Sequence, residues 1–211
     1  QQGEAGGANT DWQSQIYRQA ISSDNNISFN GGIKGLPYRL SIGYLDQDGI
    51  LKRDNLKRTT IDLNVNKDFL NKSLQLDLNV KGTYTDRLFA NTGAIGSAVA
   101  FDPTQPVYSG NNNFGGYWEW LNTNGTVNTF APKNPVGLLN ETTNHGYSHR
   151  ELGSLSLTYT FPFLKELQAN ATFGGDMTDG MGNNFTDPAS ASVPTGVGAY
   201  SQYFQENYTY N

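Results

Sequence analysis

A glycine-flanked aromatic cluster is the part of the sequence best suited to bind a ligand or a partner. Residues 114–120 read FGGYWEW, so Phe114, Tyr117, Trp118 and Trp120 lie close together along the chain. Such rings supply a large and rigid contact area, which suits stacking on a sugar face or anchoring a partner protein. We favour packing among these rings to steady a loop, with ligand or partner contact as the alternative.

Two further patterns resemble metal-binding spacings but lack essential ligands. His145 and His149 are four residues apart, a spacing that brings two ligands together only on a helix. They precede a predicted strand, along which they would lie about 13 Å apart. Residues 46–49 and 176–180 resemble calcium loops, yet neither has the glutamate that such loops need at position twelve. We therefore predict no metal site and no cofactor.

The sequence also argues against catalysis and against binding to nucleic acid. It has no Ser/His/Asp order and no phosphate-binding loop. The absence of cysteine excludes disulfides and thiolate metal sites. A formal net charge of −5 disfavours nucleic acid as a partner. We expect a protein that is not an enzyme.

Alternation of polar and apolar residues identifies the elements that must carry these groups. From residue 74 to residue 85 every even position is apolar, aromatic or glycine, and every odd position is polar or charged. Period two over this length predicts a strand whose two faces meet different surroundings. Such a strand is about 40 Å long, and at a tilt of about 45° it crosses about 28 Å, close to the thickness of the hydrocarbon layer of a bilayer.

The same alternation recurs along the chain. It covers residues 27–29, 38–44, 59–66, 154–161 and 167–173, and residues 208–210 open another strand. The polar faces include Asp62, Asp77 and Lys81, which would be costly in a dry core but not beside a wet lumen. The fold class predicted is all-β, with antiparallel strands of a transmembrane β-barrel and long extracellular loops.

Short and long connections alternate, and this predicts the sidedness. The short turns are residues 31–36, 71–73 and 162–166. The long excursions are residues 47–57, 88–145 and 175–203. Because barrels place short turns in the periplasm and long loops outside, we expect all three excursions to be extracellular. Within the longest, residues 93–101 are predicted to form a short helix that Pro103 stops.

Five stretches resemble motifs of one known family, in the same order and at the expected separations. They are residues 9–18 (NTDWQSQIYR), 26–32 (NISFNGG), 38–50 (YRLSIGYLDQDGI), 101–108 (FDPTQPVY) and 134–139 (NPVGLL). The family is that of the SusC/RagA-like TonB-dependent outer-membrane transporters. The resemblance extends over about residues 9–173.

The resemblance implies a multi-pass outer-membrane protein that imports glycans or peptides in Bacteroidota-type bacteria. Members of the family have a plug inside the barrel and a SusD-like surface lipoprotein as a lid, and TonB powers transport by pulling on the plug. The sequence has no recognisable TonB box or plug and too few strands for a barrel of about 22. We expect a fragment that begins after the plug, with the TonB complex acting through that missing region. Contact with the lid or with an oligosaccharide or peptide substrate is then the alternative role for the aromatic cluster.

These patterns divide the chain into five parts. They are a segment leading into the barrel (1–24), barrel strands with short turns (25–87), a long extracellular loop (88–146), a barrel hairpin (147–174), and a loop with the start of the next strand (175–211). The polar opening at residues 1–4 predicts either a cleaved signal peptide or an internal piece.

Two other classes of protein stay open from the sequence. A barrel without energised import, acting as an adhesin or a structural outer-membrane protein, is the main alternative. A soluble lectin-like sandwich is disfavoured by the length of the strands.

Overall fold

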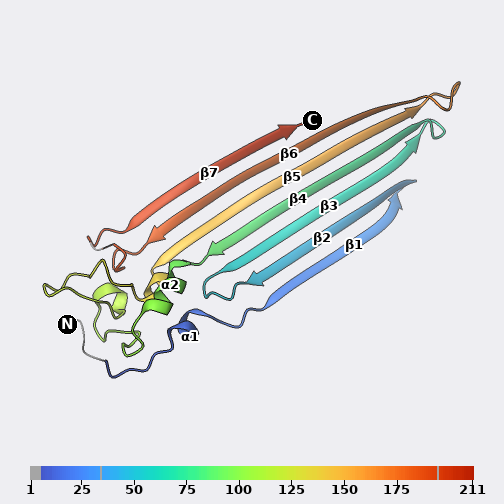
Figure 1. Cartoon of the computed structure of the whole chain (residues 1–211). Helices are drawn as coiled ribbons and strands as arrows, with labels where there is room; N and C mark the ends of the chain where they lie inside the picture. The colour runs from blue at the N-terminus through green and yellow to red at the C-terminus, as the bar shows by residue number, and fades with distance from the viewer. Residues whose placement is uncertain (1–5, 34, 194) are drawn as a thin grey trace.

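Seven antiparallel strands form one sheet in chain order, as the computed structural model shows for residues 6–33, 35–193 and 195–211 (Figure 1). The strands are β1 (Ser22–Ile33), β2 (Leu36–Asp48), β3 (Asn55–Phe69), β4 (Leu74–Phe89), β5 (Thr142–Thr160), β6 (Gln168–Thr186) and β7 (Ala199–Tyr210). The predicted all-β antiparallel architecture is confirmed. Two sequence predictions concern residues outside the described ranges: the one for residues 1–4, and the part of the first turn at Lys34.

The cross-strand register separates polar from apolar side chains as predicted. On one face Leu78 of β4 lies opposite Val65 of β3 and Leu155 of β5. On the other face the next residue of β4, Asn79, lies opposite Asn64 and Ser154. Because successive side chains of a strand point to opposite faces, an in-register sheet carries this separation across all its strands.

The apolar face of the sheet is open to its surroundings. Ile27 is 61% exposed and Phe173 is 59% exposed, although both lie in paired strands. An apolar surface this extensive is unfavourable in water and suits contact with lipid or another apolar layer.

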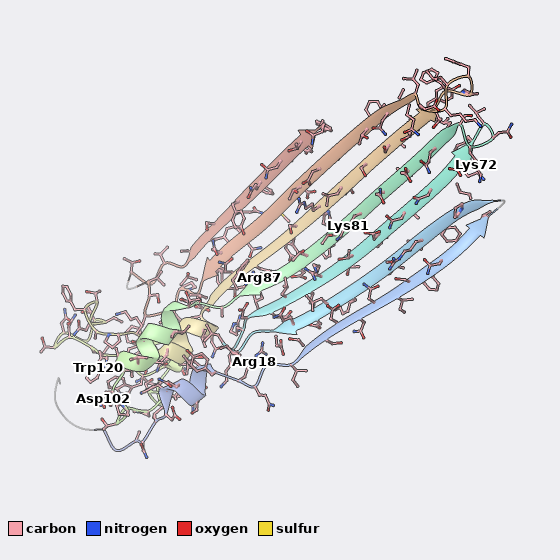
Figure 2. All side chains as sticks on the ribbon, turned by 45° about the vertical axis from the view of Figure 1, so that its right-hand side comes forward. Arg18, Lys72, Lys81, Arg87, Asp102 and Trp120 are labelled. Carbon is pink, nitrogen blue, oxygen red and sulfur yellow. The ribbon has the colours of Figure 1, made fainter. Side chains whose placement is uncertain are left out.

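Hydrogen bonds and opposite charges link the polar face. The guanidinium of Arg150 donates to both carboxylate oxygens of Asp176, at 3.0 and 2.6 Å. Lys81, near the middle of the sheet in Figure 2, lies directly opposite Asp62. Pairing of this kind lowers the cost of charges on a surface that is only partly wet.

Tight turns close one end of the sheet. β1 and β2 are joined through Gly35, whose φ of +74° is readily adopted by glycine. Leu70, Asn71 and Lys72 all have positive φ between β3 and β4, so this turn is made from three left-handed residues. The predicted short turns at 71–73 and 162–166 are confirmed. β3 ends at Phe69 and β4 begins at Leu74, while β5 ends at Thr160 and β6 begins at Gln168.

The opposite end carries the helices and the longer loops (Figure 1). The helices are α1 (Trp12–Ile16), α2 (Gly93–Ala100), the 3-10 turn η1 (Asn113–Gly116) and α3 (Pro135–Asn140). The helix predicted before Pro103 is confirmed as α2. Among the described residues, no helix has the length and apolar character needed to cross a membrane.

The prediction that a loop begins at residue 175 was wrong. β6 continues to Thr186 and β7 starts at Ala199, so the connection is only residues 187–198, and the hairpin predicted at 147–174 extends over residues 142–186. Residues 175–186 pair with β5 on one side and with β7 on the other. The ladder on both edges outweighs a weak local preference. The excursion predicted at 47–57 is likewise shorter, at residues 49–54.

The register predicts very different costs for one substitution at neighbouring positions. Leu78→Arg should destabilise the assembled barrel by about 2–4 kcal/mol, because the charge would enter the apolar face. Asn79→Arg should change the stability little, because its side chain joins polar neighbours. Urea unfolding of the two variants in lipid vesicles measures the difference. Equal losses, or a larger loss at Asn79, would show that the assignment of the faces is reversed.

Candidate functional site

A small folded unit, here called the loop domain, covers one end of the sheet. It comprises residues 6–21, 49–54 and 90–141, which are far apart in sequence and lie side by side in Figure 1. Its core is made by a single set of buried apolar residues: Trp12, Ile16, Leu51, Ala94, Ala98, Phe101 and Leu139. Each of the three segments contributes to this core, so each depends on the others for burial of its apolar surface.

Phe101 is the centre of an aromatic group within this core. Its ring packs edge-on against Trp12 at 4.6 Å and against Trp118 at 5.8 Å between ring centres. Trp120 lies 4.7 Å from Trp118, also edge-on, and Figure 2 shows it among the helices of this end. Edge-to-face contacts of this kind add to the burial energy of the rings.

The first helix is fixed by its cap and by hydrogen bonds to the neighbouring loop. The Asp11 carboxylate accepts from the backbone N–H groups of Gln13 and Ser14 and so caps α1. Arg18, at the junction with the sheet in Figure 2, donates to the Asp48 carboxylate at 2.9 Å and to the carbonyl of Asp54 at 2.7 Å. The motif at residues 9–18 therefore attaches the N-terminal segment to the β2–β3 connection.

Asn134 is the polar centre of the loop domain and is fully buried. Its side-chain oxygen accepts from the backbone N–H groups of Val136 and Gly137, which caps α3, with Pro135 at the first helical position. Its amide group donates to the carbonyls of Val107 and Trp118 at 2.9 and 3.1 Å. One side chain thus joins the start of α3 to two points of the preceding segment.

The other loop motif also has a structural role. Asp102 accepts from the backbone N–H and the hydroxyl of Thr104, both at 2.8 Å, and these bonds hold the pKa of Asp102 below its usual range. The indole N–H of Trp12 donates to the carbonyl of Asp102 at 2.9 Å. The motif at residues 101–108 therefore receives the N-terminal segment and turns the chain after α2.

The four aromatic residues singled out in the sequence lie in one half of this domain. Trp118 and Trp120 are half-buried and pack on Phe101. Tyr117 stacks on Tyr108 with ring centres 5.5 Å apart, and its hydroxyl accepts from the amide of Asn140 at 2.9 Å. Phe114 is half-buried in η1. This geometry supports the packing interpretation, while the exposed part of each ring leaves the predicted contact with a partner or substrate as a prediction.

Two glutamates of this domain are buried wholly or in part, and their burial was not predicted from the sequence. Glu119 is only 8% exposed, and burial raises its pKa to about 7. Glu141 follows α3, and burial raises its pKa to about 7 as well. The position of Glu119 between two tryptophans was the available signal, because a carboxyl group placed among large rings has a high chance of being desolvated.

The two histidines take part in separate contacts. The Nε2 atom of His145 lies 2.6 Å from the Asp86 carboxylate, and its Nδ1 atom lies 3.0 Å from the Tyr147 hydroxyl. His149 instead packs edge-on against Tyr84, with ring centres 4.8 Å apart. Within the described ranges, no group of three or more His, Cys, Asp or Glu residues is arranged to hold a metal ion.

No protein-family model matches the chain. The curated proteins that are similar to it in sequence are TonB-dependent receptors. The TonB-dependent receptor SusC of Bacteroides thetaiotaomicron is 39% identical over 88% of the chain and 20% of the relative. The TonB-dependent receptor P3 of Formosa agariphila is 28% identical over 97% of the chain and 20% of the relative. The chain thus spans about a fifth of the length of these curated relatives.

Solved structures agree in fold. The RagAB peptide importer in its closed-closed state matches 96% of the chain and 22% of its own chain, with a TM-score of 0.67 and 23% identity. The open-open state of the same importer matches 84% of the chain and 20% of its own, with a TM-score of 0.58 and 25% identity. These structures show the same fold, and the 39% identity to SusC over 88% of the chain, together with the five ordered motifs, identifies the chain as a segment of the SusC/RagA-like TonB-dependent transporter family.

Proposed function

We propose that the chain forms part of the wall of a TonB-dependent outer-membrane importer that takes up glycans or peptides. The observation that carries the proposal is the seven-stranded sheet with one exposed apolar face and one polar, hydrogen-bonded face. A wall between lipid and a wet lumen needs this arrangement on every strand. The chain performs no chemistry of its own in this proposal, since it positions and encloses rather than reacts.

Three partners follow from the proposed function. A SusD-like surface lipoprotein closes the extracellular opening of the barrel, where the loop domain lies. The TonB complex acts through the plug region. Lipid of the outer membrane covers the apolar face, on which Ile27, Phe29 and Ile61 are exposed. The unpaired outer edges of β1 and β7 in the described sheet need further strands, because lipid cannot satisfy backbone N–H and C=O groups.

The proposal is tested by uptake in cells that make the complete protein. Deleting its gene should abolish growth on one class of oligosaccharide or peptide, and removing TonB should have the same effect. Restoring the protein should restore both growth and uptake of a labelled form of that nutrient. Undiminished uptake in both deletions would instead favour a barrel that acts as an adhesin or a structural protein.

Loop length and the position of the loop domain predict the topology. In intact cells, a cysteine placed at Asn112 or at the exposed Val197 should react with a membrane-impermeant maleimide. A cysteine at Asn71, in the β3–β4 turn at the other end of the sheet, should react only after the outer membrane is opened. Labelling of Asn71 in intact cells would reverse the sidedness.

The aromatic cluster is expected to contribute to binding as well as to packing. Replacing Tyr117, Trp118 and Trp120 together with Ala should weaken retention of the lid lipoprotein or uptake of substrate. The expected loss is at least about 2 kcal/mol if one tryptophan anchors a partner. Co-purification of the lid and growth on the nutrient at equal expression are the two measurements. Barrel assembly should survive, because the strand ladder lies elsewhere.

A matched variant separates contact from packing. Phe101→Ala removes the buried centre of the same aromatic group but almost no exposed surface, since Phe101 is 3% exposed. If the triple variant loses lid retention and Phe101→Ala keeps it, the exposed rings make the contact. Equal effects of the two variants, or none from either, would leave loop packing as the whole role of the cluster.

A further inference from the structure

Glu119 is a buried acid at the centre of the loop domain. Its Oε1 atom accepts from the backbone N–H of Asn134 at 2.9 Å, at the start of α3. Its Oε2 atom is buried and has no hydrogen-bond partner among the described residues. An ionised carboxylate in this place is therefore poorly solvated, whereas a neutral carboxyl group is tolerated.

Glu141 is a second acid of this kind at the other end of α3. Its Oε1 atom is also buried without a partner among the described residues. It fills space that Gly115 leaves free, since a Cβ at Gly115 would overlap that oxygen. Asp187 and Ser190 lie beside it, and the backbone N–H of Asp187 donates to the Glu141 carbonyl at 2.8 Å. Glu141 thus joins three parts of the chain: η1, α3 and the β6–β7 connection.

Burial is the main factor that opposes ionisation of the pair, and the neighbouring groups act on the two pKa values in both directions. Glu141 raises the pKa of Glu119, and Asp187 raises the pKa of Glu141, in each case after the larger effect of burial. Lys133 acts in the opposite direction on Glu119, but its ammonium group donates to the carbonyl of Asn128 at 2.7 Å, and its own pKa is lowered by burial.

We propose that Glu119 and Glu141 form a proton-sensitive junction that holds the loop domain closed at mildly acidic pH and loosens it as the pH rises. The junction is the contact of residues 107–120 and 187–193 with α3. Loss of the two protons places negative charge at both ends of α3. The Asn134 N–H donates to Glu119, and a hydrogen bond from the Ser190 side chain lowers the pKa of Glu141. The Glu119 Oε2 and Glu141 Oε1 atoms, however, have no partner among the described residues, so we expect water to enter and to separate these segments when the pair ionises.

The direction of the pH dependence follows from the raised pKa values. In the open chain the two carboxyl groups have a pKa near 4.5, and in the closed domain the pKa of each is about 7. Between these values the closed domain binds more protons than the open chain, so closure weakens steadily as the pH rises. Closure is at its strongest below pH 4.5 and has lost the whole contribution of the pair once the pH exceeds about 7.

Hydrogen–deuterium exchange on the full-length protein in detergent tests the proposal. Between pH 5.5 and pH 8, protection of residues 107–120 and 187–193, corrected for the intrinsic exchange rate, should fall at least about tenfold. Peptides from β3 and β4 should keep their protection. The measurement needs no transport, so its outcome does not depend on the proposed function.

Neutral variants provide the decisive comparison. Glu119→Gln with Glu141→Gln mimics the protonated pair and should make the protection of these segments independent of pH. Glu141→Gln alone should remove about half of the logarithmic change, and this single variant serves if the double variant is poorly folded. Glu166→Gln is the matched control, because this exposed carboxylate lies in the β5–β6 turn at the other end of the sheet and its loss should leave the pH dependence intact. A wild-type protein whose protection is constant or rises with pH, or Gln variants that keep the wild-type slope, would overturn the proposal.

Discussion

Backbone pairing between neighbouring strands is the interaction on which the rest of the structure depends. In a bilayer no water is available to satisfy N–H and C=O groups, so each strand must pair along its whole length on both edges. Here β4 pairs from Leu74 to Phe89 with β5, and β5 pairs from Thr142 to Thr160 with β6. The unbroken register fixes which face every side chain occupies, and a slip of one residue would exchange the two faces.

The loop domain is stabilised by side-chain contacts and not by strand pairing, although it continues directly from the same strands. Its order comes from one small apolar core and from the buried side chain of Asn134, which makes hydrogen bonds to four backbone groups. Units with few buried apolar residues open at lower free energy than a continuous sheet. The loop domain can therefore rearrange without disturbing the sheet.

Much of the sheet could be predicted from the sequence, because side-chain alternation is a local signal. The face that Leu78 or Asn79 occupies needs only the period of two. The extent of β6 could not be predicted, since Gly180, Gly182 and Asn183 favour a turn locally and form strand only through partners on β5 and β7. Likewise, the packing of Trp118 and Trp120 depends on Phe101 and Trp12, and the burial of Glu119 depends on α3. Contacts between segments that are distant in sequence produce no periodic pattern of residue types, so they could not be predicted from the sequence.

The family motifs acquire a physical meaning from these contacts. Residues 9–18 supply Trp12 and Arg18, residues 101–108 supply Phe101 and Asp102, and residues 134–139 supply Asn134. All three motifs meet in the loop domain, and two of them lie in a long loop, where sequence is usually free to vary. A loop domain assembled from three separate segments needs particular residues at each joint, because replacing any one exposes a buried donor or an apolar ring on the other two. Three of the five family motifs therefore lie where the loop domain is held together, and the other two, residues 26–32 and 38–50, lie along β1 and β2.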